Sequence, residues 1–287
     1  MRYLLFLVCL VASTLLTQRV FAVSATEFVR FDLADYSDDQ TNVTGINVIA
    51  EDADGFMWVG GENGLAHFTG ARAHIYRPGY NNPNTLISHY VRDLLFENDN
   101  ILWVATSGGL SRLDIAKGQF THFTQQSGHL PGNDVSSLLR LKNQLIIGTT
   151  SGLATLDFQT LENTRPLFIQ KMRKGFNINA MTWQGDDLWL GSTQELGRIN
   201  VRSQNIQFYQ FEENNPQALP YRGSFDVFAQ GDTLWIASMQ GGVYSFDRRS
   251  ETFSKVPDHI RDKIGTSVVN LYGDEQHTLW VLSLIHI

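Results

Sequence analysis

A Trp-centred strand returns along this chain at nearly constant intervals, and this repeat constrains the fold more than any other feature. Its clearest copy is Ile101-Leu-Trp-Val-Ala-Thr-Ser-Gly-Gly-Leu110, an apolar strand followed by a small residue and a Gly turn. The slot of the Trp is occupied by Trp58, Trp103, Ile146, Trp189, Trp235 and Trp280, at spacings of 45, 43, 43, 46 and 45 residues. A period of this length, in units rich in short strands, is typical of a β-propeller.

Each unit contains four short strands separated by turn residues, which is the content of one propeller blade. The sequence therefore predicts an all-β propeller with five complete four-stranded antiparallel blades and the start of a sixth. The blades are expected at residues 46–76, 91–123, 135–169, 178–211, 225–256 and 268–281, with the last strand of the third blade over 166–169.

Two features of the repeat predict how the blades pack. The Trp slot is expected to form the core between blades, because Ile146 fills it in one unit and an aliphatic residue offers no stacking face. Two residues after the slot, the first five units always have a small residue, which indicates a close approach of neighbouring backbones. These residues are Gly60, Ala105, Gly148, Gly191 and Ala237.

Residues 1–22 predict a secretory signal peptide. Arg2 precedes an apolar stretch over 4–16, and Val20-Phe-Ala22 offers small residues at the −3 and −1 cleavage positions. An uncleaved anchor is the alternative, although the apolar stretch is short for a membrane span of about 20 residues. Cleavage removes Cys9, the only cysteine, so the mature chain would have no disulfide and no thiolate ligand. We therefore expect an exported protein.

The two ends of the propeller region predict a fragment. Residues 27–33 read as a strand without a blade of its own, and an open ring would leave sheet edges unpaired. We expect this strand to be the outer strand of a final blade whose other strands lie beyond the chain. At Leu282 the small-residue slot is broken, and residues 282–287 resemble the translated end of a sequencing adapter. The partial propeller is thus predicted over 23–281, followed by an artefactual tail.

The repeat consensus is V-x-x-[IL]-x-x-D-x-[DG]-x-[LM]-W-[VI]-[GA]-[TS]-x-x-G-[LV], with its best copies at 46–68 and 91–114. It resembles the two-component regulator propeller repeat. Ile146 and Glu195 depart from the pattern, and the fifth unit has one extra residue before Val243.

The resemblance implies a periplasmic sensor propeller, seven-bladed in the intact protein, that is anchored in the inner membrane. Its output module would be a histidine kinase, often hybrid, or a diguanylate cyclase. It further implies a non-catalytic fragment without a cofactor. Such a sensor would bind a small extracellular ligand such as a glycan, and the intact receptor would be a homodimer.

The sequence supports no metal or catalytic site. Asp52-Ala-Asp-Gly55 is similar to the start of a calcium loop, but a strand follows directly, so we interpret it and its counterparts at 186–187 and 273–275 as hairpin turns. The histidines have no zinc-binding spacing, and no Gly-x-Ser-x-Gly motif is present. The net charge of −7 argues against nucleic acid as a partner.

Ligand binding is predicted on the face formed by the loops between blades and by the turns between the second and third strands of a blade. Glu195 and Arg222 place a charge in these loops, where we expect solvated side chains. The candidate residues are Glu62, Asn63, His89, Tyr90, Gln194, Glu195, Tyr221, Arg222, Met239 and Gln240.

Two other functions remain open. A secreted propeller enzyme, such as a lyase or glycosidase, would bring titratable residues together in the central channel. A protein-interaction scaffold would have a flat binding face without a pocket.

Overall fold

Six antiparallel sheets follow one another in the computed structural model, which describes residues 32–37, 42–164, 166–173, 175–274 and 276–284. Four of them are complete four-stranded blades with their strands in sequence order. These are β1 (Val48–Glu51), β2 (Met57–Gly61), β3 (Gly64–Phe68) and β4 (Ala73–Tyr76); β5 (Val91–Asn98), β6 (Ile101–Thr106), β7 (Gly109–Asp114) and β8 (Gln119–Phe123); β12 (Ala180–Gln184), β13 (Asp187–Gly191), β14 (Glu195–Asn200) and β15 (Asn205–Gln210); and β16 (Asp226–Gln230), β17 (Thr233–Ser238), β18 (Gly242–Asp247) and β19 (Thr252–Lys255).

The third and sixth sheets are shorter. The third contains β9 (Val135–Leu141), β10 (Gln144–Thr149) and β11 (Gly152–Asp157), and the sixth contains β20 (Val268–Gly273) and β21 (Leu279–Ser283). The predicted fold class, a propeller of four-stranded antiparallel blades, is confirmed.

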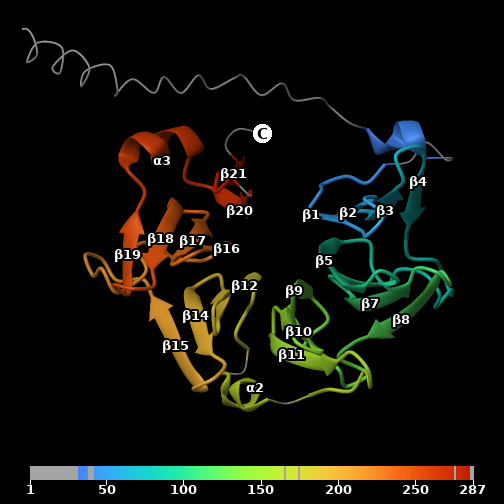
Figure 1. Cartoon of the computed structure of the whole chain (residues 1–287), viewed down its shortest axis with the longest axis horizontal. Coiled ribbons are helices and arrows are strands. Elements are labelled where there is room, and N and C mark those ends of the chain that lie inside the picture. The colour runs from blue at the N-terminus through green and yellow to red at the C-terminus, as the bar shows by residue number, and fades with distance from the viewer. Residues whose placement is uncertain (1–31, 38–41, 165, 174, 275, 285–287) are drawn as a thin grey trace, which may run out of the picture. The chain divides into compact units, whose positions relative to one another are not determined.

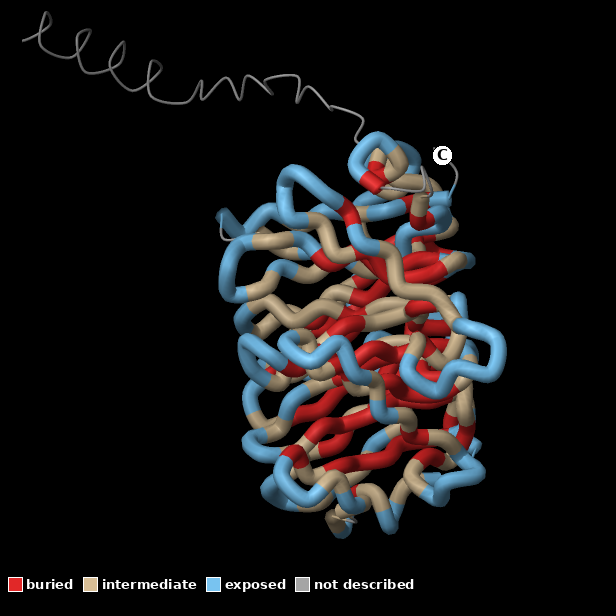
Figure 2. Tube along the Cα trace, turned by 90° about the vertical axis from the view of Figure 1, so that its right-hand side faces the viewer, coloured by how far each residue is buried: buried red, intermediate tan, exposed pale blue. Residues whose placement is uncertain are grey.

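The sheets are arranged around a common centre, with β1, β5, β9, β12, β16 and β20 innermost (Figure 1). Apolar side chains of neighbouring blades form shared clusters, for example Trp58 and Leu65 of the first blade with Leu94 and Leu102 of the second. Buried residues run through the middle of the stacked strands, whereas exposed residues gather at the turns (Figure 2). The core therefore lies between the blades, and the turns are left for other roles.

The prediction of a strand over 166–169 was wrong. Residues Leu167–Lys171 form the short helix α2, which begins directly after Pro166. Proline has no N–H to donate to a strand ladder, and its fixed φ, here −57°, suits the start of a helix. The fourth strand of this blade is reduced to a bridge between Leu156 and Asn163.

The predicted signal peptide and residues 27–31 of the predicted closing strand lie outside the described residues. Leu33 begins a 3₁₀ helix, η1 (Leu33–Tyr36), that contacts β4, and Ser37 pairs with Ala73 in a parallel bridge. At the other end, Leu282 and Ser283 belong to β21. A second helix, α3 (Asp258–Ile264), precedes β20. No helix in the described part of the chain is long and apolar enough to cross a membrane.

The slot of the Trp is a core position in most of the units. Trp58, Trp103, Ile146 and Trp189 have no exposed surface, and Trp235 is half-buried. Trp280 was also predicted as a core residue, and this prediction was wrong, because its side chain is 45% exposed. It lies in the sixth sheet, the last one in the described part of the chain.

A second regularity accompanies the core Trp residues. The indole N–H groups of Trp58, Trp103 and Trp189 donate to a side chain just before the Trp strand, as in Trp58 to Asp52 (3.0 Å) and Trp103 to Glu97 (3.0 Å). Asp52 also accepts two backbone N–H bonds of its own turn, from Asp54 and Phe56. The carboxylates that stand six residues before the Trp therefore connect this end of the hairpin to the core. This agrees with the interpretation of residues 52–55 as a hairpin turn.

The small residues two positions after the Trp slot make room for the next blade. A Cβ on Gly148 would lie 2.8 Å from the side chain of Ile178, and one on Gly191 would lie 2.7 Å from the carbonyl oxygen of Ser224. Both neighbours belong to the segment that enters the following blade. Leu282, at the same position of the sixth unit, is 49% exposed.

Candidate functional site: the central channel

The innermost strands of all six sheets line one cavity of about 410 Å³ at the centre of the ring. Polar residues dominate its lining, including Asn47, Arg92, Ser136, Asn179 and Asn270. The channel is therefore a polar site inside an apolar ring of blades.

Four of these polar residues stand at equivalent positions, immediately before or at the start of the inner strand, and each ties its blade to the next one. The bonds are Asn47 Nδ2 to Val91 O (2.8 Å), Arg92 Nη2 to Asp134 Oδ2 (3.2 Å), Ser136 Oγ to Ile178 O (2.5 Å) and Asn179 Nδ2 to Ser224 O (3.4 Å). The fifth blade has Phe225 at this position, and a phenyl ring cannot make such a bond. The ring of polar side chains thus holds neighbouring blades in register.

At the next position along the chain, two carboxyl groups also bond to the following blade. Asp93 accepts the N–H of Leu94 (2.8 Å) and the N–H of Leu138 (2.6 Å) in the next blade. In the fifth blade, Asp226 accepts the N–H of Val227 (2.9 Å) and that of Leu271 (2.7 Å), again in the next blade. Asp226 therefore supplies the connection that Phe225 lacks.

Both carboxyl groups titrate at unusually high pH. Burial, aided by the nearby charge of Asp226, raises the pKa of Asp93 to about 7 against the opposing effect of the two N–H bonds. Burial likewise raises the pKa of Asp226 to about 6. Each residue nevertheless keeps a partly exposed surface. The channel thus contains two acids that change charge near neutral pH.

This constellation was missed at the level of sequence. The inner strands β5 and β16 carry other polar residues as well, so the sequence pattern singles out neither Asp93 nor Asp226. The channel could hold a small polar ligand, since amides, hydroxyls and carboxyls converge there. In the described part of the chain, no three His, Cys, Asp or Glu side chains are grouped so as to hold a metal ion.

Of the ten predicted loop-face residues, Tyr90 lies in the channel. Its ring sits 5.1 Å from the Arg92 guanidinium, which keeps the phenol at the mouth of the cavity. His89, directly before it, is exposed. The channel and the predicted loop face therefore meet at the entry to the second blade.

Four other predicted residues come together in the fifth blade. The ring of Tyr221 packs against Gly241, next to the exposed Met239 and Gln240, and Ser238 donates to the carbonyl oxygen of Arg222 (3.2 Å). Tyr221 also lines a pocket of about 490 Å³, in which Lys255 lies 4.9 Å from its ring.

The remaining predicted residues are separate from both groups. Asn63 is structural, because its amide oxygen accepts the N–H of Thr44 (2.7 Å) and its amide nitrogen donates to Asn42 (3.0 Å). Glu62 and Gln194 are exposed at their turns.

Glu195 differs from the expectation of a solvated side chain. It begins strand β14, is only 4% exposed and forms an ion pair with Arg173. The guanidinium of Arg173 in turn packs against the rings of Phe176 and Phe208. A buried carboxylate needs a partner of opposite charge. Arg173, which follows shortly after α2, supplies this positive charge.

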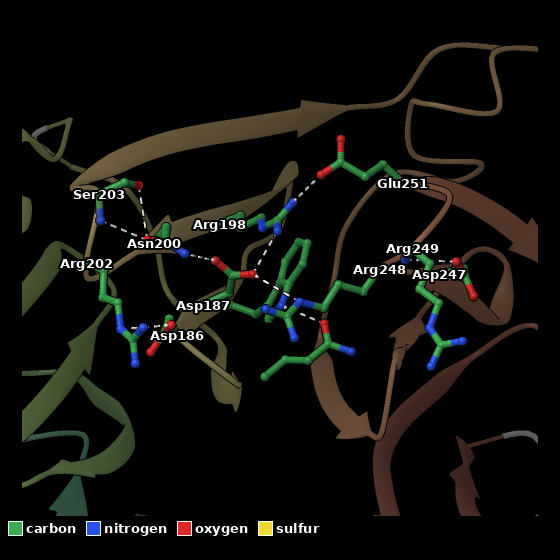
Figure 3. Close-up of polar contacts among 12 residues, drawn as sticks. Asp186, Asp187, Arg198, Asn200, Arg202, Ser203, Asp247, Arg248, Arg249 and Glu251 are labelled. Atoms are coloured by element: carbon green, nitrogen blue, oxygen red, sulfur yellow. Dashed lines mark hydrogen bonds and ion pairs between the residues drawn. The ribbon is translucent and has the colours of Figure 1, made fainter.

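Asp187 also differs from the turn interpretation of 186–187. Asp186 lies in the turn, but Asp187 begins β13 and has no exposed surface (Figure 3). Its carboxylate contacts Arg198 (2.7 Å) and Arg248 (3.6 Å) and accepts a bond from Asn200 (2.8 Å). Because Arg248 belongs to the fifth blade, this network joins two blades. We interpret it as structural.

Residues 41–63 match the family model described as "Two component regulator propeller". No curated protein sequence matches the chain. Among solved structures, the extracellular domain of the putative hybrid two component system BT3049 from B. thetaiotaomicron is similar, with a TM-score of 0.56, 17% identity, and coverage of 89% of this chain and 40% of that one.

Two further structures are similar at comparable levels. The extracellular domain of BT4673 from the same organism has a TM-score of 0.60 and 17% identity, over 83% of this chain and 37% of that one. PorZ, a surface component of the type-IX secretion system of Porphyromonas gingivalis, has a TM-score of 0.61 and 16% identity, over 84% and 37%.

At these identities the likeness concerns the fold, and the chain spans about 40% of the length of these proteins. The matched segment overlaps the first of the six units that share the Trp-centred consensus. The matched segment thus carries one copy of the two-component regulator propeller repeat.

Proposed function

We propose that this chain is the sensor propeller of a signalling protein of the bacterial envelope, and that it binds a small extracellular ligand. The observation that carries the proposal is the combination of the regulator-propeller repeat with a polar central channel that opens beside the loop-face residue Tyr90. Two of the similar structures are extracellular domains of proteins described as signalling systems, which supports the same role.

The proposal includes export to the periplasm, an inner-membrane anchor, a histidine kinase or diguanylate cyclase output, and a homodimeric receptor. Export is tested first, by fusing alkaline phosphatase after Leu284, because this enzyme is active only when it is oxidised outside the cytoplasm. High phosphatase activity that disappears when residues 1–22 are deleted supports export. An inactive fusion that is stably produced contradicts it.

Ligand binding is tested by thermal unfolding of the purified chain with neutral oligosaccharides, since a glycan is the proposed ligand. A ligand at about 100 times its Kd stabilises by about 2.7 kcal/mol, which corresponds to a rise in Tm of roughly 5–10 °C. Tyr90→Ala should reduce this shift. Tyr80→Ala is the matched control, because Tyr80 is 97% exposed and outside the channel. Equal shifts in both variants would place binding elsewhere.

A secreted enzyme is the second candidate, and one observation favours it: Asp93 and Asp226 line the same channel with raised pKa values. Against it, each of the four carboxyl oxygens already accepts a backbone N–H bond. Turnover of an oligosaccharide by the purified chain that is abolished in Asp226→Asn, with binding retained, would favour the enzyme.

A further inference from the structure

A second pocket, of about 770 Å³, lies between the third and fourth blades. It is lined by the β9–β10 and β12–β13 turns, by Val201 and Gln204 after β14, and by Pro166 and Phe168 around α2. In an antiparallel blade, successive turns alternate between two sides of the ring. The turns between first and second strands therefore lie on the side opposite to the turns between second and third strands. The pocket is therefore separate from the loop face and from the central channel.

The repeat pattern is broken at this pocket. Six residues before the Trp slot, units one, two and six carry Asp52, Glu97 and Asp274, which accept the indole N–H of their own blade. Unit four carries Trp183 there, and the neighbouring Gln184 accepts the N–H of Trp189 instead (3.2 Å). A large aromatic side chain near the end of β12 thus occupies a position that in three other units carries a carboxylate.

Trp183 is held in place without being buried. Its indole N–H donates to the carbonyl oxygen of Arg140 in the preceding blade (3.1 Å), and its side chain stays partly exposed as a wall of the pocket. The buried Phe168 of α2 also lines the pocket and adds an apolar ring to it. Leu141 and Val201 complete the apolar lining.

The charges at the rim are not balanced. Arg202 pairs with Asp186 (3.1 Å), and Asp157 accepts bonds from Asn143 and from its own turn. Arg140 instead donates to the neutral carbonyl of Glu97 and lies 4.7 Å from the ring of Phe158.

Lys142 is exposed at the β9–β10 turn, with a positive φ of 55°. Within the described ranges, neither it nor Arg140 forms an ion pair, although both line the pocket. Two basic residues without an acidic partner in the described part of the chain therefore line this apolar slot.

We propose that this pocket binds a small aromatic carboxylate. The ring of such a ligand would pack against the indole of Trp183 and the apolar lining, and its carboxylate would lie toward Arg140 and Lys142. A pocket of this volume suits a small molecule, and a mainly apolar lining with a few directed polar groups is typical of such sites. Aromatic stacking and a charge-assisted contact provide separate parts of the affinity.

The test uses trans-cinnamate as the probe, its neutral counterpart trans-cinnamamide, and isothermal titration calorimetry with the whole chain. We expect saturable binding of cinnamate with a Kd of about 1 mM or lower, and at least about tenfold weaker binding of the amide. Trp183→Glu should weaken cinnamate binding by at least about tenfold. This variant restores the acid that other units carry at this position, so it should fold, as checked by circular dichroism and Tm.

Lys142→Gln provides a second, surface variant that leaves the fold intact, and we expect it to weaken binding about threefold or more. Lys117→Gln, at an exposed turn of the second blade outside the pocket, is the matched control and should bind like the parent protein. Absence of saturable binding up to about 10 mM, equal affinities for acid and amide, or unchanged affinity in Trp183→Glu would each overturn the proposal.

Discussion

Asp93→Asn should flatten the dependence of stability on pH, because Asp93 links two blades through a carboxyl group that burial keeps protonated up to about pH 7. In the unfolded chain the same group has an ordinary pKa of 3.8. Between these two values the folded protein holds a proton that the unfolded chain has released. The free energy of unfolding must therefore fall as pH rises from about 4 through 7.

The magnitude follows from the size of this shift. Each pKa unit is worth about 1.4 kcal/mol, so full burial would give an upper limit of about 4 kcal/mol. Asp93 keeps some exposed surface, where water screens the charge, and we expect about 1–2 kcal/mol between pH 5 and pH 8. The asparagine also loses one acceptor for a backbone N–H, which costs about 1 kcal/mol at every pH. The slope with pH, not the absolute stability, is therefore the diagnostic quantity.

The assay is urea unfolding followed by circular dichroism at several pH values from 5 to 8. Asp99→Asn, an exposed acid at the tip of the β5–β6 turn in the same blade, is the control and should keep the parent slope. A smaller residual slope should remain in Asp93→Asn because Asp226 titrates at about pH 6. If stability of the parent protein rises from pH 5 to pH 8, the N–H bonds outweigh burial and the argument is refuted.

Three further predictions concern the packing between blades, each measured as the change in free energy of unfolding in urea. Trp103→Ala should cost about 3–5 kcal/mol because the side chain has no exposed surface, whereas Trp280→Ala, at a position 45% exposed, should cost about 1 kcal/mol or less; equal costs would contradict the burial argument. Ala229→Asp should raise the free energy of unfolding by about 1 kcal/mol, because the new carboxylate offers the acceptor that the buried Nε1 of Trp235 lacks among the described residues. No gain in stability would mean that the carboxylate at this position does not reach the indole N–H. Asp187→Ala should destabilise by about 3–5 kcal/mol since it leaves two arginines of different blades without their buried partner, and a loss under about 1 kcal/mol would show that solvent already compensates them.

The blade architecture could be predicted because the same sequence pattern recurs in every unit. An apolar strand around a Trp, a small residue two positions later and a Gly turn are local patterns, and each satisfies the same packing demand in every blade. Gly148 and Gly191, for instance, lie where the chain enters the next blade, so only a small residue fits. The third blade escaped prediction where Pro166 converts the expected strand into α2.

The candidate site could be predicted only in outline. Tyr90 was found as a loop residue and does line the channel, but Asp93 and Asp226 were not recognised, because the bonds that define them run to Leu138 and Leu271 of other blades. A contact 45 residues away in sequence leaves no local pattern to read.

The sequence by itself thus determined the repeat, the all-β propeller class and the positions of the core slots, because these depend on periodic burial within one unit. Only the tertiary structure decided which polar residues are buried and paired. From the sequence we expected a solvated side chain at Glu195, yet it is buried and forms an ion pair with Arg173. Trp183, near the end of β12, is a hydrophobic residue that remains partly exposed because it lines a pocket. The physical reason is the same in both cases: burial and charge compensation are properties of the space between blades, and that space exists only once the ring is assembled.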